Sequence, residues 1–120
     1  MGGLIDSQLN SMLCVYYIAA PSAPPQNIDG FAVDHTTIRL MWEPPPLYLR
    51  NGLVTQYTIN VTERESGLTF QHATPSLEIL LSDLHPDYVY ECRVAAVTIA
   101  EGPFTEVFAI RALVSCKLFL

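Results

Sequence analysis

The stretch that most constrains the fold covers residues 88–97 and reads Tyr-Val-Tyr-Glu-Cys-Arg-Val-Ala-Ala-Val. From Tyr90 onward, apolar side chains occupy every second position, whereas Glu91 and Arg93 fall between them. A strand directs successive side chains to opposite faces, so this alternation predicts a strand with one buried face. Residues 84–87, Leu-His-Pro-Asp, precede it and form a turn signal, because proline fixes φ and aspartate favours turns. A turn leading into a Tyr-bearing strand predicts a tyrosine corner, in which the Tyr90 hydroxyl bonds nearby backbone at a sandwich edge.

The rest of the chain contains further short alternating stretches separated by turn residues, and no stretch has a sustained helical period. The predicted strands span residues 26–33, 36–43, 53–63, 68–73, 76–81, 88–97 and 104–113. We expect Ile28 and one of Phe31 or Val33 to point inward, Gly30 to mark a bulge or a kink, and strand 68–73 to lie at an edge. Residues 100–103 form the last hairpin turn. This pattern predicts an all-β, seven-stranded, antiparallel immunoglobulin-like β-sandwich.

Length and charge exclude several classes of function. The chain has 120 residues, of which 50% are hydrophobic, so one domain with a packed core is expected. The net charge of −6 and the scattered Lys and Arg provide no basic patch for nucleic acid and no attraction to an anionic membrane surface. No run reaches the roughly 18 apolar residues of a membrane-spanning helix. We therefore expect no nucleic acid partner and no membrane insertion by this segment.

The cysteines are Cys14, Cys92 and Cys116, and no CxxC or Cys/His spacing indicates a zinc site. Cys92 lies on the inward parity of its strand, which favours a buried free thiol. A bridge between Cys14 and Cys116 is the less favoured alternative, so the cysteines leave the redox compartment open.

Both ends of the chain lie outside the predicted sandwich. Residues 1–22 are expected to be an N-terminal tail and a proline-rich linker, residues 23–113 the domain, and residues 114–120 a C-terminal tail. The apolar run at 13–20 has the length of a signal-peptide core, but no Lys or Arg precedes it.

Several motifs together resemble the fibronectin type III family, in the right order over about three quarters of the chain. The matching residues are Ala23-Pro24-Pro25, Leu40-Met41-Trp42-Glu43-Pro44-Pro45, Asn51-Gly52, Tyr57-Thr58-Ile59, Leu84-x-Pro86-x-x-x-Tyr90, Arg93-Val94-Ala95-Ala96 and Gly102-Pro103. The alternation and the resemblance together imply a structural core of Trp42, Tyr57, Ile59, Leu84, Tyr90, Cys92 and Val94. Within the family, residues 20–27 and 102–105 are most similar to repeats of receptor-type tyrosine phosphatases, with the Q type as the preferred subtype.

Residues able to carry chemistry are few. Asn60-Val61-Thr62 is an N-glycosylation sequon, and Asn60 falls on the outward parity. The phosphatase His-Cys-x5-Arg loop is absent from the sequence, as are a GxSxG turn, a calcium loop and a Gly-rich phosphate loop. His35, His72 and His85 are expected in or beside turns, as solvated loop residues. We therefore predict no catalytic, cofactor or metal site in this chain, and no cofactor.

Exposed apolar residues are the remaining candidates for contact. Tyr48, Leu49 and Leu53 flank a loop that either packs over one end of the sandwich or forms a contact site. Residues Met41, Leu80, Val89 and Val97 fall on outward parities and either form an apolar stripe or are scattered.

The resemblance implies a non-catalytic, extracellular spacer and adhesion module of a multidomain cell-surface receptor. Neighbouring repeats and a protein ligand are the expected partners, and the isolated domain is expected to be monomeric. The alternative is an intracellular scaffold module of a muscle or cytoskeletal protein, in which the thiols would stay reduced and Asn60 would carry no glycan.

Overall fold

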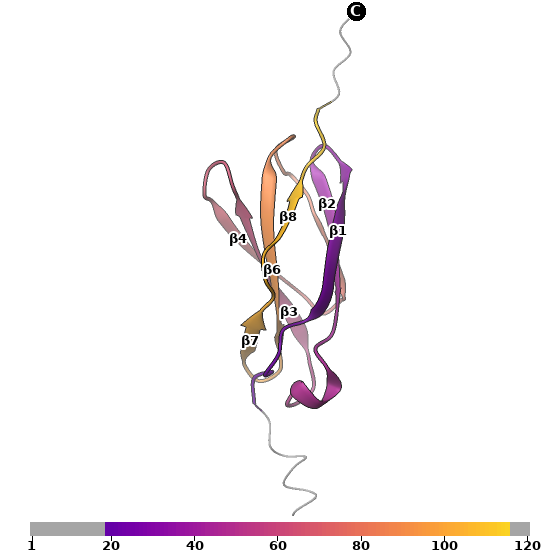
Figure 1. Ribbon diagram of the computed structural model, residues 1–120, viewed down its shortest axis with the longest axis vertical. Helices are drawn as coiled ribbons and strands as arrows, with labels where there is room; N and C mark the ends of the chain where they lie inside the picture. Colours follow the sequence, from indigo (N-terminus) through magenta and orange to yellow (C-terminus); the bar gives the residue numbers. More distant parts are fainter. Residues whose placement is uncertain (1–18, 116–120) are drawn as a thin grey trace, which may run out of the picture.

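The computed structural model describes residues 19–115 (Figure 1), which form two packed layers of antiparallel strands. The strands are β1 (Gln26–Asp34), β2 (Thr37–Glu43), β3 (Gln56–Glu63), β4 (Thr69–Thr74), β5 (Glu78–Leu81), β6 (Val89–Val97), β7 (Glu101–Phe104) and β8 (Phe108–Arg111), and a 3-10 turn, η1, spans Leu47–Leu49. The predicted all-β antiparallel sandwich is confirmed. Cys14 and Cys116, and with them the question of a bridge between the tails, lie outside the described residues.

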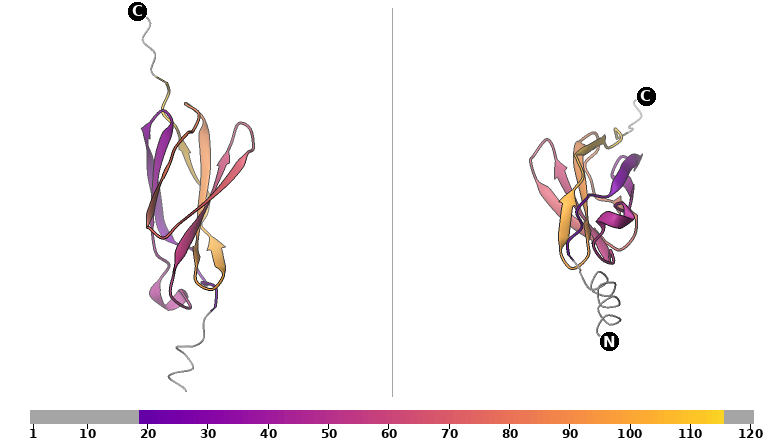
Figure 2. Two further views of the ribbon diagram at one scale, coloured as in Figure 1. Left: turned by 180° about the vertical axis from the view of Figure 1, so that it is seen from behind. Right: turned by 60° about the horizontal axis from the view of Figure 1, so that its bottom comes forward.

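One layer, the minor sheet, has the order β1-β2-β5, and the other, the major sheet, has the order β4-β3-β6-β7 with β8 also pairing with β6. Figure 2 shows the two layers from behind and in an oblique view with the lower end of the molecule turned forward. The β4 strand lies at an edge of the major sheet, as predicted for residues 68–73. The central pair, β3 and β6, stays in register from Gln56↔Val97 to Glu63↔Tyr90 without a shift. This unbroken pair provides the platform on which the minor sheet packs.

The core lies between the sheets and consists of the inward parity of each central strand. In β3, Tyr57, Ile59 and Val61 are at most 4% exposed. Of the predicted core residues, Trp42, Tyr57, Ile59, Tyr90, Cys92 and Val94 lie in one buried cluster, and Leu84 packs against it as a partly buried residue. Burying an aliphatic side chain contributes about 1.5–3 kcal/mol, so the cluster is the main stabilising element of the fold.

The described residues contain eight strands, because the predicted strand 104–113 is divided. The pairs Ala95↔Phe104 and Cys92↔Phe108 leave residues 105–107 facing only residues 93–94, so one extra residue interrupts the ladder. Thr105 fills the break, since its N–H donates to the Val94 oxygen and its hydroxyl accepts from the Val94 N–H. The predicted hairpin turn at 100–103 is also wrong, because pairing resumes at Glu101, opposite Val97.

In β1, Ile28 packs against the core as predicted, but neither Phe31 nor Val33 points inward. Phe31 and Val33 are 50% and 49% exposed, whereas Ala32 packs against the core together with Ile28. Gly30 is not the bulge, since it pairs with Leu40 and the register shifts lie on either side of it. A Cβ at Gly30 would come within 2.6 Å of the Arg39 carbonyl oxygen, so close packing of strands explains this glycine.

Candidate functional site

The tyrosine corner lies where β6 begins, at one end of the sandwich. The Tyr90 side chain is fully buried, and its hydroxyl oxygen accepts a hydrogen bond from the His85 backbone N–H at 2.7 Å. This is the predicted bond to nearby backbone. Burial raises the pKa of the Tyr90 hydroxyl, so it remains a neutral donor.

Glu63 at the end of β3 completes the corner. Its side chain is 5% exposed, and Oε2 accepts a hydrogen bond from the Tyr90 hydroxyl at 3.1 Å. Oε1 accepts from the Ser66 hydroxyl at 2.5 Å, and His85 Nε2 lies 3.8 Å from Oε2. A buried carboxylate needs such donors to offset its desolvation, so this network ties β3 to the turn before β6. Inward and outward side chains alternate along β3 as far as Glu63. This alternation is the feature of the sequence that indicates an inward position for Glu63.

Trp42 occupies the inward face of β2 and is 3% exposed. Its ring meets Tyr57 edge to face, with centroids 5.5 Å apart. The Trp42 Nε1 donor has no hydrogen-bond partner among the described residues. The indole therefore contributes through packing rather than through a polar contact.

Cys92 lies in the same buried cluster and is a free thiol. Burial raises its pKa to about 12. A nucleophilic cysteine needs an accessible thiolate, so Cys92 behaves as a small apolar core residue.

The segment just before the predicted domain boundary is bonded to the sandwich. The Ala19 N–H donates to the Asn51 oxygen at 2.9 Å, and the Ser22 N–H donates to the Leu49 oxygen at 2.8 Å. The Asn51 amide in turn donates to the Ala20 carbonyl at 3.0 Å and to the Ser22 hydroxyl at 2.6 Å. We call residues 19–22 the N-terminal joint.

Two further features shape the N-terminal joint. Pro21 is buried against Gly102, where an added Cβ would lie 2.9 Å from the proline ring. Asn51 adopts a left-handed φ of 58°, which Asn tolerates better than most residues. The backbone of the N-terminal joint therefore follows a defined path on this end of the sandwich.

The sequon lies on the outer face of the major sheet. Asn60 is partly exposed in β3 and stands in register with Gln71 of β4 and Arg93 of β6. The Thr62 hydroxyl, two residues on and on the same face, hydrogen-bonds the Thr69 hydroxyl at 3.1 Å. Both required side chains of the sequon thus face away from the core.

The loop after the triple proline lies at the same end as the N-terminal joint. Tyr48 and Leu53 are each 81% exposed, so they do not pack over the end of the sandwich. Only Leu49 is partly buried, and its oxygen accepts from Ser22.

The predicted outward apolar residues do not form one stripe. Met41 and Leu80 lie on the minor sheet, whereas Val89 and Val97 lie on the major sheet. Val89 is only 7% exposed, so it does not belong to an exposed apolar surface.

No constellation suited to catalysis is found within residues 19–115. These residues contain no group of three or more His, Cys, Asp and Glu side chains that could hold a metal ion. His35 lies in a turn and His85 lies directly before one, as expected. His72 lies inside β4, so the expected position in or beside a turn is wrong for this residue. In the described part of the chain, no helix is long and apolar enough to cross a membrane.

The fold, the corner and the unreactive thiol define a non-catalytic β-sandwich module. The family described as "Fibronectin type III domain" matches residues 23–111, and the chain belongs to this family. Catalysis in relatives that are enzymes lies in other domains.

Several similar proteins are named as receptors. Receptor-type tyrosine-protein phosphatase F of Bos taurus is 37% identical over 78 residues, which cover 65% of this chain and 4% of that protein. Roundabout homolog 2 of Homo sapiens is 35% identical over 88 residues, covering 68% of this chain and 6% of that protein. The crystal structure of the FN5 domain of Drosophila Lar superposes with a TM-score of 0.65 at 25% identity, covering 80% of this chain and 100% of that domain.

The predicted similarity to receptor-type phosphatases is confirmed at the level of the family, through type F and Lar. The preference for the Q type stays a prediction. This chain matches only a small fraction of the length of these relatives.

Proposed function

We propose that residues 23–113 are an extracellular spacer and protein-binding module of a multidomain cell-surface receptor of the tyrosine phosphatase type. The observation that carries this proposal is the position of the two ends. The segment that leads into β1 and the segment that leaves β8 lie at opposite ends of the long axis of the sandwich (Figure 1). A domain placed in series through these ends would hold its neighbours a sandwich length apart.

Hydrogen bonds at both ends support the spacer role. The N-terminal joint is bonded to Asn51 at one end. At the other end, the Leu113 oxygen accepts from the Asp87 N–H at 3.2 Å, and the Arg111 guanidinium donates to the Asp87 carbonyl at 2.6 Å. Tension applied to the chain would reach the sheets through these bonds rather than through a free linker.

The extracellular location is supported by the receptor relatives and by the outward-facing sequon at Asn60. The module would carry an N-linked glycan on the major sheet and act as a monomer, with neighbouring repeats and a protein ligand as partners. The parent protein would bear its enzymatic activity in another domain.

The experiment is surface labelling of cells that express the parent protein, followed by treatment with peptide N-glycosidase. We expect an antibody against the domain to stain intact cells. We also expect the glycosidase to lower the mass of the isolated, secreted chain, and to leave the mass of its Asn60→Gln variant unchanged. Staining only after permeabilisation, with no glycan on the wild-type chain, would instead support the intracellular scaffold.

A further inference from the structure

The outer face of the minor sheet carries two apolar side chains, Phe31 and Leu80, on either side of Arg39. Phe31 of β1 stands opposite Arg39 of β2, and Arg39 stands opposite Leu80 of β5, so the three side chains form one row across the sheet. Phe31 is 50% exposed and Leu80 is 62% exposed. Directly opposed side chains in a sheet have Cβ atoms about 5 Å apart, so this row is continuous.

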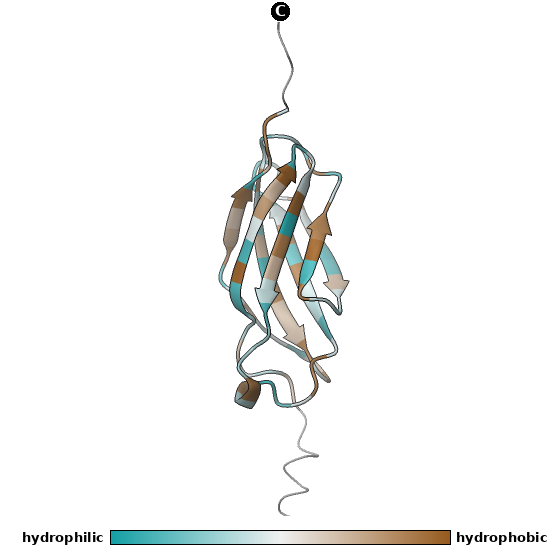
Figure 3. Cartoon of the chain, turned by 90° about the vertical axis from the view of Figure 1, so that its right-hand side faces the viewer, coloured by the Kyte–Doolittle hydropathy of each residue, from teal (hydrophilic) through white to brown (hydrophobic). Residues whose placement is uncertain are grey.

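The next outward position on β2, two residues after Arg39, adds another apolar side chain to this face. Met41 stands between Asp29 and Glu78 and is partly exposed. At the far end of β1, Val33 is 49% exposed. We call Phe31, Val33, Met41 and Leu80 the apolar strip. Figure 3, which views the side of the molecule that carries β1 and β2, shows apolar segments between polar ones along the strands.

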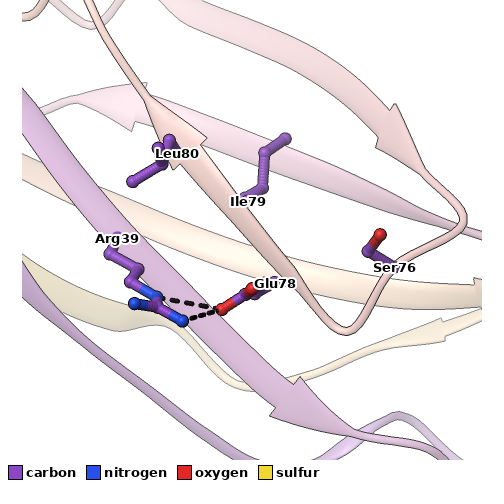
Figure 4. A pocket seen from close by; sticks show the side chains of 5 residues that line it. All are labelled: Arg39, Ser76, Glu78, Ile79 and Leu80. Atoms are coloured by element: carbon purple, nitrogen blue, oxygen red, sulfur yellow. Dashed lines mark hydrogen bonds and ion pairs between the residues drawn. The ribbon is translucent and has the colours of Figure 1, made fainter.

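Acidic side chains surround the strip. The strands of the minor sheet carry the carboxylates of Asp29, Asp34, Glu43 and Glu78 and one basic side chain, that of Arg39. The Arg39 guanidinium is already engaged, because its Nε donates to Glu78 Oε1 at 2.9 Å and its Nη2 bonds the same oxygen (Figure 4). The strip is therefore an apolar surface in a negative field.

A depression of about 470 Å³ adjoins the strip at the free edge of β5. It is lined by Arg39, Ser76, Glu78, Ile79 and Leu80. A partner side chain placed in this depression would contact Leu80 and Ile79 beside the Arg39–Glu78 pair. The depression is a recess beside the apolar strip in which a side chain can be anchored.

The charges select among possible occupants. A second copy of this face would bring like carboxylates together, which opposes self-association. An anionic membrane surface is repelled for the same reason. The glycan proposed at Asn60 would cover the opposite face and leave this one open.

We propose that the apolar strip is the protein-binding surface of the module, and that its partner is a polypeptide segment with aliphatic side chains flanked by Lys or Arg. This inference rests on the proposed binding role. The aliphatic side chains would cover Phe31 and Leu80, and the basic ones would meet the carboxylates at the rim. Apolar contact would supply affinity, and charge would supply orientation and association rate.

The test uses the ¹⁵N-labelled chain of 120 residues and synthetic peptides of alternating Lys and Leu, followed by amide chemical shifts. We expect shifts confined to β1, β2 and β5. A peptide with Ser in place of Leu, and one with Glu in place of Lys, separate the apolar from the charge contribution. Both are expected to bind at least about tenfold more weakly, which corresponds to about 1.4 kcal/mol.

Variants then locate the site. Leu80→Ser and Phe31→Ser are each expected to weaken binding of the Lys/Leu peptide about tenfold. Asp29→Asn is expected to weaken binding of the same peptide by less, and to reduce the salt dependence of the affinity. Val107→Ser is the matched control, because Val107 is 52% exposed and lies between β7 and β8 of the other layer. Its affinity is expected to stay within about twofold of the wild type.

Equal affinity of wild type and Leu80→Ser would overturn the proposal, as would shifts centred on the major sheet. Sedimentation of the isolated chain as a dimer that Leu80→Ser dissociates would assign the strip to a second copy instead. These outcomes are independent of surface labelling and glycosidase treatment, so failure here leaves the receptor-module proposal standing.

Discussion

Replacing Tyr90 by Phe removes one oxygen from a packed core and leaves the ring in place. The lost hydroxyl accepts from the His85 N–H and donates to the Glu63 carboxylate. A neutral hydrogen bond contributes about 0.5–1.5 kcal/mol net, and one to a charged group about 1.5–3 kcal/mol. Together these give an expected loss of about 2–4.5 kcal/mol in the free energy of unfolding. For a domain of this size the melting temperature should fall by at least about 8 °C.

The assay is urea unfolding followed by tryptophan fluorescence, with Tyr48→Phe as the matched control. Tyr48 is 81% exposed, so the control should change stability by no more than about 0.5 kcal/mol. Glu63→Gln, alone and combined with Tyr90→Phe, completes a double-mutant cycle, and we expect a coupling energy above about 0.5 kcal/mol. A loss below about 1 kcal/mol in Tyr90→Phe would show that the buried network does not stabilise the corner.

Three further outcomes are expected. Trp42→Ala should lower stability by about 3–5 kcal/mol, measured by denaturant unfolding, and a loss below about 1 would remove the indole from the core. Burial raises the pKa of Cys92 from 9.0 to about 12. The buried, protonated thiol therefore contributes fully to the free energy of unfolding below pH 9, and this contribution is lost as the pH rises toward 12. Cys92→Ala should therefore reduce the alkaline decline in stability by roughly 1.4 kcal/mol per pH unit, and an unchanged decline would argue against burial. Asn51→Gly keeps the left-handed backbone but removes the amide donor, so hydrogen exchange at Ala19 and Ser22 should accelerate; unchanged rates would mean that the amide does not hold the joint.

The sequence predicts the sheets well wherever alternation is unbroken. In β2, β3 and β6 the inward parity read from the sequence is the buried one, because a single register error would expose every apolar side chain. The sequence contains no comparable pattern that marks the break between β7 and β8. It depends on one extra residue relative to β6, and Thr105, Glu106 and Val107 are compatible with a continuous strand.

Contacts that join distant parts of the chain could not be predicted. The Glu63–Tyr90 bond spans 27 residues, and the bond between Asn51 and Ala20 spans 31. The domain boundary at the prolines was predicted from composition. The N-terminal joint before that boundary is held by Asn51, and the sequence indicates only a turn at this asparagine. The row from Phe31 to Leu80 likewise depends on pairing across β2, which the order of strands in space determines.

The stiffness of the module is tested most directly by the distance between its two ends. Spin labels at Ala20→Cys and Val114→Cys, with Cys14 and Cys116 replaced by Ser, leave only the buried Cys92 as a native thiol. If the N-terminal joint and the sheets form one stiff unit, double electron–electron resonance should give a single narrow distance distribution that broadens in Asn51→Gly. A broad distribution in the chain with native Asn51 would mean that the linker moves freely on the sandwich, and the spacer mechanism would be wrong.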